Sequence, residues 1–399
     1  MRCLAVDVGT GTQDILLFDA DRELENDYQL ILPSPTVLVA EAIHRASEAR
    51  LPLLLTGATM GGGPSGWAAE THARAGLAVW ATPDAARTLD DDLERVRALG
   101  VEVIGEDEAA ALRRRRGRRL AHVEMLDFDH RRLAAAFGAA GIDLARDVDA
   151  VAVAVFDHGA APPGESDRRY RFAYLARRLD EAEADGSGLA AFAYRAETIP
   201  ADLTRLAAAA GSVARSPLGG RPIVAMDTAP AAILGALDDR AVRAAVAHGR
   251  RIVAANVGNF HALAFAFEPD GRVDGVVEHH TGALTRPRLA RFLRRLAEGT
   301  LTNAEVFGSM GHGALVRDAP ARAAANGRAP LLAVTGPRQT LLGEGRLAGL
   351  GRPLAAVPHG DMMLAGCFGL LRGLAALLPE WREPVERRLG PPAWAPGRG

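Results

Sequence analysis

LAVDVGTGTQDILLFDADR, residues 4–22, aligns without a gap on VAANVGNFHALAFAFEPDG, residues 253–271, at a fixed offset of 249 positions. Each copy has the pattern of a strand, a tight polar turn, a second strand and a second turn. Identical residues include Gly9 with Gly258 and Phe18 with Phe267. The match predicts two related β-hairpins that face one another. Two unrelated amphipathic hairpins that resemble each other by chance are the alternative.

The first turn, GTGT at residues 9–12, has the composition of an anion-binding site. Small residues can leave consecutive backbone N–H groups pointing into one concavity, and the hydroxyls of Thr10 and Thr12 can add donors. Asp7, at the end of the first strand, is placed to hold the water shell of a Mg²⁺ that bridges phosphates. Its counterpart in the second copy is the uncharged Asn256. Two such turns could clamp one triphosphate, whereas either turn alone could equally belong to an ordinary hairpin.

Composition sets limits on the other functions that the chain could have. Of its 399 residues, 48% are hydrophobic and 24% are charged, which is ordinary for a soluble protein with two domains. The formal net charge of −2 gives no general attraction for nucleic acid or membrane. The N-terminus runs directly into a charged strand, and no apolar stretch reaches the roughly 18 residues of a membrane span. We therefore expect a cytoplasmic protein without a signal peptide or membrane segment.

All 47 basic residues are arginine, because the sequence contains no lysine. A Walker-type phosphate loop requires a lysine, and a Schiff-base enzyme requires a lysine amine. Both classes are therefore excluded. The cysteines, Cys3 and Cys367, form neither a disulfide framework nor a cysteine-rich metal site.

Short apolar strands alternate with helices along the rest of the chain, and this alternation predicts an α/β protein. Further strands are expected at residues 25–32, 51–55, 78–81, 101–104, 151–156, 222–226, 273–277 and 331–334. Helices are expected at residues 36–49, 84–99, 227–237, 286–297 and 361–378, and several more within 167–217.

Five segments occur in an order that resembles the actin, heat-shock chaperone ATPase and sugar kinase superfamily. They are DVGTGTQD (7–14), DTAPAAILGALDD (227–239), NVGN (256–259), AVTGPR (333–338) and GDMMLAGCFGLL (360–371). The resemblance covers both ends of the chain and leaves about residues 35–220 unmatched. It implies two actin-like (ribonuclease H-like) domains with mixed sheets and a nucleotide cleft between them.

The same resemblance implies domain bounds. The first actin-like domain would span residues 1–240 with a large insertion at about 35–220, the second residues 250–358, and a closing inter-domain helix residues 359–380. Small residues at 231–235 and 365–369 would let two helices cross closely between the domains and act as a hinge. Ordinary tight core packing of these helices is the alternative.

The ligands implied by the resemblance are ATP and Mg²⁺, with Asp7 as the metal residue. The implied nucleotide-binding residues are Gly9, Thr10, Gly11, Thr12, Gln13, Asn256, Gly258, Asn259, His280, Thr281, Gly282, Thr335, Gly336 and Pro337. The chain departs from the superfamily where Asn256 replaces the usual acidic residue and where Phe260-His261 replace small residues. Nucleotide binding is therefore better supported than efficient hydrolysis.

Asp157 is the candidate catalytic base beside Asp7. It directly follows a buried strand, and parallel strands direct their carboxyl ends toward the ligand crevice of an open α/β sheet. His158 could tune it or contact substrate. Alternatively, Asp157 caps the following turn, as aspartate often does.

Four histidines, at positions 261, 279, 280 and 312, fall close together in the sequence. Adjacent His279 and His280 on extended backbone would point to opposite faces, so they cannot share one metal without a kink. No HxxxH or HxH spacing indicates zinc. A role of His280 in the nucleotide site and a transition-metal site remain alternatives.

Two further segments have open interpretations. TGATMGGGPSG, residues 56–66, could cradle an anion through backbone amides, or it could be a flexible connection. RRRRGRR, residues 113–119, could bind a polyanion, but no aromatic residues interleave it, so a solvated helix surface is favoured.

More narrowly, the chain is similar to an uncharacterised family labelled pyruvate formate-lyase activating enzyme-like. A radical enzyme of that kind needs three closely spaced cysteine ligands for an iron–sulfur cluster, and the chain has two cysteines. We instead predict a Mg²⁺-dependent phosphotransferase or ATPase that acts on a small hydroxylated or carboxylated metabolite. The alternative is a switch protein whose slow ATP turnover regulates a protein partner. Neither nucleic acid nor membrane is an expected partner.

Overall fold

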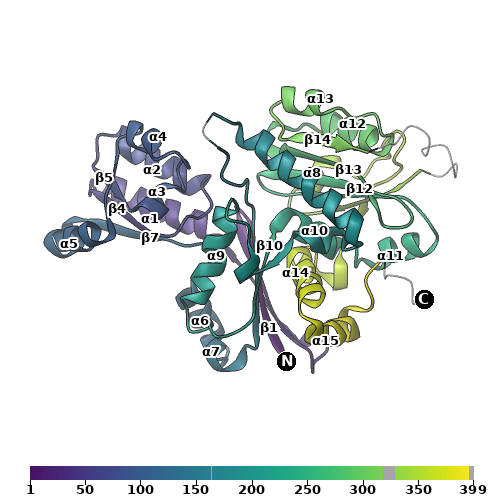
Figure 1. The fold of residues 1–399 in the computed structure, drawn as a ribbon, viewed down its shortest axis with the longest axis horizontal. Coiled ribbons are helices and arrows are strands. Elements are labelled where there is room, and N and C mark those ends of the chain that lie inside the picture. The colour runs from purple at the N-terminus through teal and green to yellow at the C-terminus, as the bar shows by residue number, and fades with distance from the viewer. Residues whose placement is uncertain (163, 318–328, 395–399) are drawn as a thin grey trace.

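The computed structural model describes residues 1–162, 164–317 and 329–394. Within these ranges the chain forms fifteen α-helices and three β-sheets, two mixed and one parallel (Figure 1). The predicted α/β class is therefore confirmed. No helix among the described residues is long and apolar enough to cross a membrane.

The first sheet has six strands in the order β3-β2-β1-β8-β10-β9. Their bounds are β1 Arg2–Val8, β2 Thr12–Asp19, β3 Tyr28–Pro33, β8 Ala150–Val155, β9 Ala193–Arg195 and β10 Ile223–Asp227. Strands β1, β2 and β3 pair antiparallel with one another, whereas β8 and β10 continue the sheet parallel to β1.

The second sheet repeats this arrangement in the order β14-β13-β12-β11-β15-β16. Its strands are β11 Ile252–Val257, β12 His261–Phe267, β13 Val273–His280, β14 Gly313–Val316, β15 Leu331–Thr335 and β16 Leu354–Ala355. Again an antiparallel hairpin is extended by an antiparallel third strand on one side and by a parallel strand on the other.

The two hairpins also share their register. Leu4 pairs with Leu17 in the first hairpin, and Val253 pairs with Ala266 in the second, so both partners shift by the same 249 positions. Their turns agree as well. A Cβ on Gly9 would lie 3.0 Å from the carbonyl oxygen of Thr12, and one on Gly258 would lie 2.9 Å from that of His261. The hairpin repeat predicted from the sequence is confirmed.

A third, inserted sheet is parallel throughout, in the order β6-β5-β4-β7. Its strands are β4 Leu53–Gly57, β5 Val79–Ala81, β6 Val101–Val103 and β7 Ala121–Met125. The helices around it are α1 Pro35–Glu48, α2 Pro64–Arg74, α3 Pro83–Ala86, α4 Leu93–Ala98 and α5 Glu106–Arg116. This unit has its own buried cluster and projects to one side of the molecule (Figure 1).

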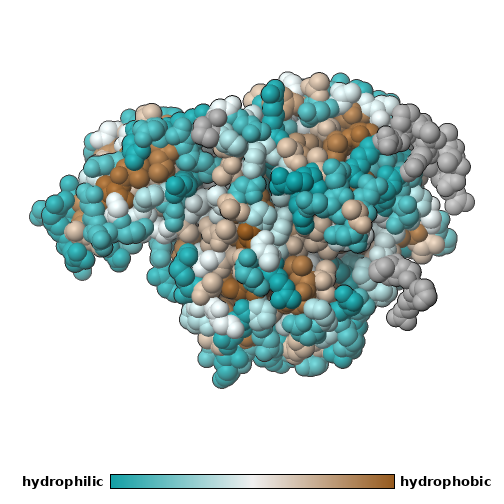
Figure 2. All heavy atoms as spheres, viewed as in Figure 1, coloured by the Kyte–Doolittle hydropathy of each residue, from teal (hydrophilic) through white to brown (hydrophobic). Residues whose placement is uncertain are grey.

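The acidic helix expected at residues 84–99 is a wrong prediction, because the structure divides it into α3 and α4. The side chain of Asp92 accepts a hydrogen bond from the backbone N–H of Glu94 and caps α4. Aspartate favours such N-terminal caps over helix interiors, so it starts a new helix. The arginine run, residues 113–119, covers the exposed end of α5 and the 3₁₀ turn after it, at the hydrophilic tip of the projecting unit (Figure 2), as favoured from the sequence.

The remaining helices cover the first and second sheets. They are α6 His130–Ala139, α7 Leu144–Asp147, α8 Asp167–Asp185, α9 Thr204–Ala214, α10 Thr228–Ala236, α11 Arg240–Ala247, α12 Arg286–Ala297, α13 Asn303–Gly308, α14 Ala365–Leu377 and α15 Pro379–Leu389. Strand β9 interrupts the stretch 167–217, where helices and no strand were expected.

Helices α10 and α14 cross between the first and second sheets. Helix α10 follows β10 of the first sheet but contacts β11 and β15 of the second, while α14 packs against β1, β8 and β10 of the first. Glycines make the close approach possible. A Cβ on Gly235 would lie 1.8 Å from the carbonyl oxygen of Ala365, and one on Gly369 would lie 1.9 Å from that of Ala231.

Gly235→Ala should therefore destabilise the protein, because the new methyl group meets backbone that cannot rotate away. We expect the free energy of unfolding to fall by about 1–3 kcal/mol or more in urea denaturation. The matched control is Gly138→Ala in α6, where nothing lies within 4 Å of the added Cβ. That control should be neutral or slightly stabilising, because alanine favours helix over glycine. Equal stabilities of the two variants would contradict the close crossing.

Candidate functional site

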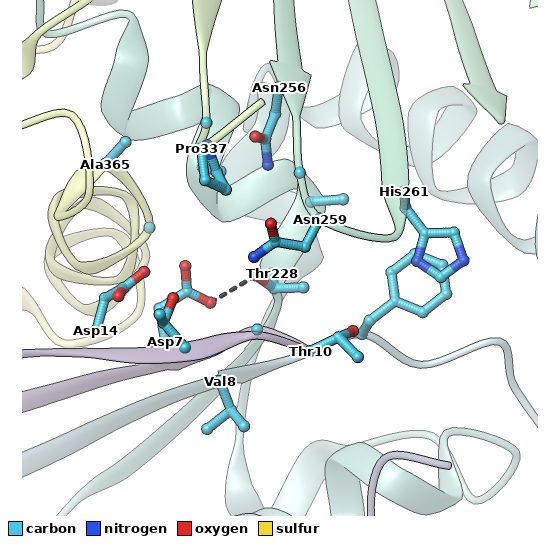
Figure 3. A pocket seen from close by; sticks show the side chains of 18 of the residues that line it. Asp7, Val8, Thr10, Asp14, Thr228, Asn256, Asn259, His261, Pro337 and Ala365 are labelled. Carbon is cyan, nitrogen blue, oxygen red and sulfur yellow. Dashed lines mark hydrogen bonds between the residues drawn. The ribbon is translucent and has the colours of Figure 1, made fainter. Parts of the chain in front are cut away.

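The main functional candidate is a cavity at the carboxyl ends of strands from both mixed sheets. Its lining includes residues at or just beyond the ends of β1, β8, β10, β11 and β15, together with the start of α14. The empty space amounts to about 810 Å³, including the part open to solvent. The carboxyl ends of parallel strands are where open α/β sheets bind ligands. Figure 3 shows side chains from both sheets converging on this space.

Both hairpin turns line the cavity and touch each other across it. Gly9 and Thr10 come from the first turn, and Gly258 and Asn259 from the second. A Cβ on Gly11 would lie 2.4 Å from the side-chain nitrogen of Asn259, so the Asn259 amide rests against the first turn. A ligand that enters between the turns must displace this side chain.

One end of the cavity is acidic. Asp7 and Asp14 are opposite each other in the β1–β2 register, and both carboxyl groups are buried (Figure 3). The hydroxyl of Thr228 donates to Asp7 Oδ1 over 2.5 Å. Asp14 Oδ1 has no hydrogen-bond partner among the described residues. On the other side of Asp7, a Cβ on Gly366 of α14 would lie 1.7 Å from Oδ2, so only glycine fits there.

Burial raises the pKa values of both carboxyl groups, because a low-dielectric site disfavours the charged form. It raises the pKa of Asp7 to about 7, although the hydrogen bond from Thr228 opposes the shift. Burial, aided by the negative charge of Asp7, raises the pKa of Asp14 to about 8. At neutral pH this pair therefore shares fewer than two negative charges and would gain from a nearby cation.

Asp14 is a site residue that the sequence analysis missed. A usable signal was present, because the hairpin register places Asp7 and Asp14 directly across from each other. Like charges at such positions destabilise a sheet. Two carboxyl groups placed this way on a buried hairpin therefore favour a function over a purely structural role. The equivalent pair in the second hairpin is Asn256 and Leu263, which carries no charge.

Ten of the residues predicted to be catalytic, nucleotide-binding or metal-binding line this cavity. They are Asp7, Gly9, Thr10, Thr12, Asn256, Gly258, Asn259, Thr335, Gly336 and Pro337. The turn after β15 lies against β11, since a Cβ on Gly336 would be 2.3 Å from Asn256 Oδ1. The described lining does not include Gly11, Gln13, Asp157, His280, Thr281 or Gly282. Gln13 instead donates its side-chain amide to the Pro33 carbonyl over 3.3 Å.

Asp157 is buried, and backbone N–H groups donate a hydrogen bond to each of its carboxylate oxygens. Oδ1 accepts from Gly159 N and Oδ2 from Leu206 N, each over 2.8 Å. This geometry fits the capping alternative, in which Asp157 holds the loop after β8 against α9. The base role of Asp157 stays a prediction.

A buried ion-pair group lies behind the cavity. Arg171 of α8 pairs with Asp227 at the end of β10 and with Glu278 of β13, the latter over 3.3 Å. Its Nη1 also donates to the Asp157 carbonyl over 2.9 Å. Two carboxylates around one guanidinium leave a formal excess of one negative charge. The group joins the first and second sheets, and removing one partner would leave an uncompensated buried charge.

Histidines gather next to the ion-pair group. One ring nitrogen from each of three residues lies within 4.8 Å of the other two; the residues are His158, His261 and His312. His280 packs beside them, with its ring centroid 4.5 Å from that of His312. His279 points to the other face of β13, where its Nε2 lies 3.0 Å from the carbonyl oxygen of Ser309. The expectation that the two adjacent histidines face opposite ways is confirmed.

The three clustered histidines are neutral at ordinary pH. Burial lowers the pKa of His312 to about 2, and the positive charges around it act in the same direction. Burial also lowers the pKa values of His158 and His261 well below the usual value. A neutral imidazole has a free lone pair on one ring nitrogen, so each can accept a hydrogen bond or bind a metal.

The inserted sheet reaches the cavity through the glycine-rich segment 56–66 and the helix after it. A Cβ on Gly61 would lie 2.6 Å from Nη2 of Arg205, which lines the cavity and pairs with Asp127 over 2.7 Å. Trp67 of α2 contacts Phe260 of the second turn, with ring centroids 5.7 Å apart. These contacts close one side of the cavity with residues of the insertion.

A family model described as "Putative pyruvate format-lyase activating enzyme (DUF1786)" matches residues 60–341. The chain belongs to this family. The match spans strands β5, β6 and β7 of the inserted sheet, strands β8 and β10 of the first sheet, and the histidine cluster. No curated protein matches the chain.

The two cysteines of this chain cannot supply the ligands that the activity in the family description requires. An iron–sulfur cluster of a radical enzyme is held by cysteine thiolates, and the chain has two cysteines. Both Cys3 and Cys367 are buried in the core. Burial raises the pKa of the Cys367 thiol well above its usual value, which disfavours the thiolate that would bind iron.

Asp14→Asn should flatten the pH dependence of stability. Because the folded-state pKa of Asp14 lies above its unfolded value, the folded protein binds the extra proton between about pH 4 and 8. This stabilising contribution is complete below that window and is lost as the pH rises through it. The variant should therefore lose less stability between pH 5 and 8, by up to about 1.4 kcal/mol per pH unit.

Urea unfolding at several pH values measures this effect. Glu48→Gln, which removes an exposed acid of α1, serves as control and should keep the slope of the unaltered protein. If the Asp14→Asn and unaltered proteins show the same slope, the raised pKa of Asp14 is wrong.

Proposed function

We propose that this chain is an actin-like protein that binds ATP with Mg²⁺ and transfers the terminal phosphoryl group to a small hydroxylated or carboxylated acceptor, or to water. The supporting observation is that the glycine turns of two matching hairpins and the Asp7–Asp14 pair line one cavity. The two sheets also share strand order and sense, and helices α10 and α14 cross between them. That arrangement is what the resemblance to the superfamily implies.

The acidic end of the cavity fits Mg²⁺. This cation prefers oxygen ligands and usually binds through one or two carboxylates while it keeps several waters. Asp7 and Asp14 would supply those carboxylates, and the unpartnered Oδ1 of Asp14 provides a buried acceptor. A dication would also favour the ionised form of both groups, which burial alone disfavours. When bound, Mg²⁺ bridges phosphate oxygens and neutralises their charge.

The turns fit the polyphosphate of a nucleotide. Backbone amides of the two glycine turns and the hydroxyls of Thr10 and Thr12 offer neutral donors at the centre of the cavity. Arg205 adds a positive charge in place of the lysine that the chain lacks. Thr335, Gly336 and Pro337 line the side that the resemblance assigns to adenosine. Asn259 would leave its contact with Gly11 and turn toward the phosphates.

A switch protein is the second candidate, and the crossing of α10 and α14 favours it. The two helices meet through backbone at Gly235 and Gly369, where no side chain projects, so they could slide when the sheets close on a ligand. ATP consumption separates the candidates. In a metabolite screen, a phosphotransferase should consume ATP much faster when one particular metabolite is present. A switch protein should instead show slow ATP turnover that a protein partner stimulates.

Asp7→Asn should abolish the Mg²⁺-dependent part of ATP binding. The substitution keeps the size of the side chain and the contact with Thr228 but removes the charge that would hold the metal. In titration calorimetry, the affinity of the variant for ATP with Mg²⁺ should fall to the level that the unaltered protein shows in EDTA. The control is Asp27→Asn, which removes a buried acid outside the cavity and should keep full affinity.

Undiminished binding by Asp7→Asn would contradict the metal role of Asp7. Failure of the unaltered protein to bind any nucleotide, in a thermal-shift screen with and without Mg²⁺, would contradict the proposed function as a whole.

Asp157→Asn tests whether this residue is a base or a cap. An asparagine has one acceptor oxygen, so either Gly159 N or Leu206 N loses its partner. We expect the free energy of unfolding in urea to fall by about 1–3 kcal/mol, the usual cost of an unsatisfied buried amide. The base role predicts, in addition, lower ATP turnover at unchanged nucleotide affinity. An unchanged turnover rate would remove Asp157 as the base, and an unchanged stability would remove it as a cap.

A further inference from the structure

The histidine cluster defined by His158, His261 and His312 brings together segments that are far apart in the sequence. His158 follows β8 of the first sheet, His261 begins β12 of the second, and His312 precedes β14. His261 also lines the cavity, at the end away from Asp7 (Figure 3). The fold therefore aims three imidazoles from both mixed sheets at one point beside the cavity.

The spacing of these rings suits a metal ion. Nε2 of His158 and Nε2 of His312 lie 3.4 Å apart. In a tetrahedral zinc site with Zn–N bonds of about 2.0–2.1 Å, neighbouring nitrogens are separated by about 3.3–3.4 Å. His261 is held in place by stacking on Phe156, with ring centroids 4.1 Å apart and planes 8° from parallel. One nitrogen from each ring lies within 4.8 Å of the others, so small rotations would complete the set.

The surroundings of His312 provide an independent observation. Its Nδ1 lies 3.7 Å from Oε1 of Glu278. Both atoms are buried, and neither has a hydrogen-bond partner among the described residues. If Nε2 of His312 binds a metal, the proton must sit on Nδ1 and face Glu278. A carboxylate behind a metal-bound histidine is the common arrangement that fixes the ring and raises its basicity.

We propose that His158, His261 and His312 bind a divalent first-row transition metal, with zinc as the best fit, and that Glu278 orients His312 behind it. Three protein ligands leave a fourth position for water or a ligand, as in catalytic rather than structural zinc sites. His261 also lines the cavity, so the proposed site borders it.

Charges of both signs lie near the cluster. Asp227 and Glu278 outnumber the Arg171 guanidinium by one formal charge, whereas Arg168 and Arg205 add positive charge near the rings. Ligand chemistry separates this site from the acidic end of the cavity. Imidazole nitrogens suit zinc and other transition metals, whereas carboxylates and water suit Mg²⁺. The site thus differs from the one proposed for Asp7 and Asp14 and does not depend on it.

His280 is not included in the ligand set. Its ring packs against His312, but its nitrogens are not part of the group whose ligand atoms converge. His279 is excluded because it faces Ser309 on the opposite side of β13. The third member of the cluster is His158, which follows β8. No short spacing in the sequence connects it to His261 and His312.

Metal content and metal binding test the proposal without nucleotide or activity. The full chain is purified without a polyhistidine tag, and its metal is measured by plasma mass spectrometry. The chelator-treated protein is then titrated with Zn²⁺ in a calorimeter and with Co²⁺ in a spectrophotometer. We expect about one metal ion per chain and visible Co²⁺ bands of a tetrahedral nitrogen site. His158→Gln and His261→Gln, at half-buried positions, should each lose the metal and the bands.

Two controls keep the result specific. His44→Gln removes an exposed histidine of α1 and should keep the metal. Asp7→Asn should also keep it, because that variant alters only the acidic end of the cavity. Glu278→Gln should bind Zn²⁺ about 10–100-fold more weakly, as expected when the partner of a ligating histidine is removed. Far-UV circular dichroism confirms that each variant is folded before its metal is counted.

The proposal is overturned if the purified chain has no metal and its chelator-treated form binds neither Zn²⁺ nor Co²⁺ at micromolar concentrations. It is equally overturned if folded His158→Gln and His261→Gln bind these ions as well as the unaltered chain does. Either result would mean that the cluster has a structural role, in which His158 and His312 form a hydrogen bond and no metal is bound.

Discussion

The crossing of α10 and α14 is the contact on which the arrangement of this protein depends. Each helix leaves one mixed sheet and packs on the other, so the pair ties the two repeats together. The helices approach until main chain meets main chain, which Gly235 and Gly369 permit. One turn from Gly369, Gly366 brings the start of α14 against the carboxyl group of Asp7. The same small-residue contact therefore joins the sheets and sets the acidic end of the cavity.

Burial gives the cavity two chemically different ends. Around Asp7 and Asp14, loss of water destabilises the negatively charged form of the carboxyl groups. These groups therefore favour binding a proton or a metal ion. Around His312, the same loss of water keeps imidazoles neutral and their lone pairs free. Between the ends lie the glycine turns, which present backbone rather than charge. A single low-dielectric space thus offers oxygen donors on one side and nitrogen donors on the other.

The sequence predicted what local pattern controls. The hairpin repeat, the buried strand β8 and the arginine-rich helix α12 follow from apolar periodicity and turn residues, and their bounds agree closely. It did not predict features that depend on distant partners. Asp157 accepts from Leu206 N, 49 positions away, and His158 meets His312 across 154 positions. The Asp92 cap that divides a helix is local and was missed as well. The pairing of Asp7 with Asp14 was missed, although it could have been predicted from the sequence, because it requires only the register of one hairpin.

The contact of Trp67 with Phe260 has a practical consequence. It joins the inserted sheet to the second glycine turn, at the mouth of the cavity, and leaves the indole largely open to water. Indole emission responds to such surroundings, and any separation of the two rings would alter it. Trp67, one of four tryptophans in the chain, is thus an intrinsic fluorescent reporter beside the cavity, and separation of the inserted unit from the second turn can be followed without attaching a dye.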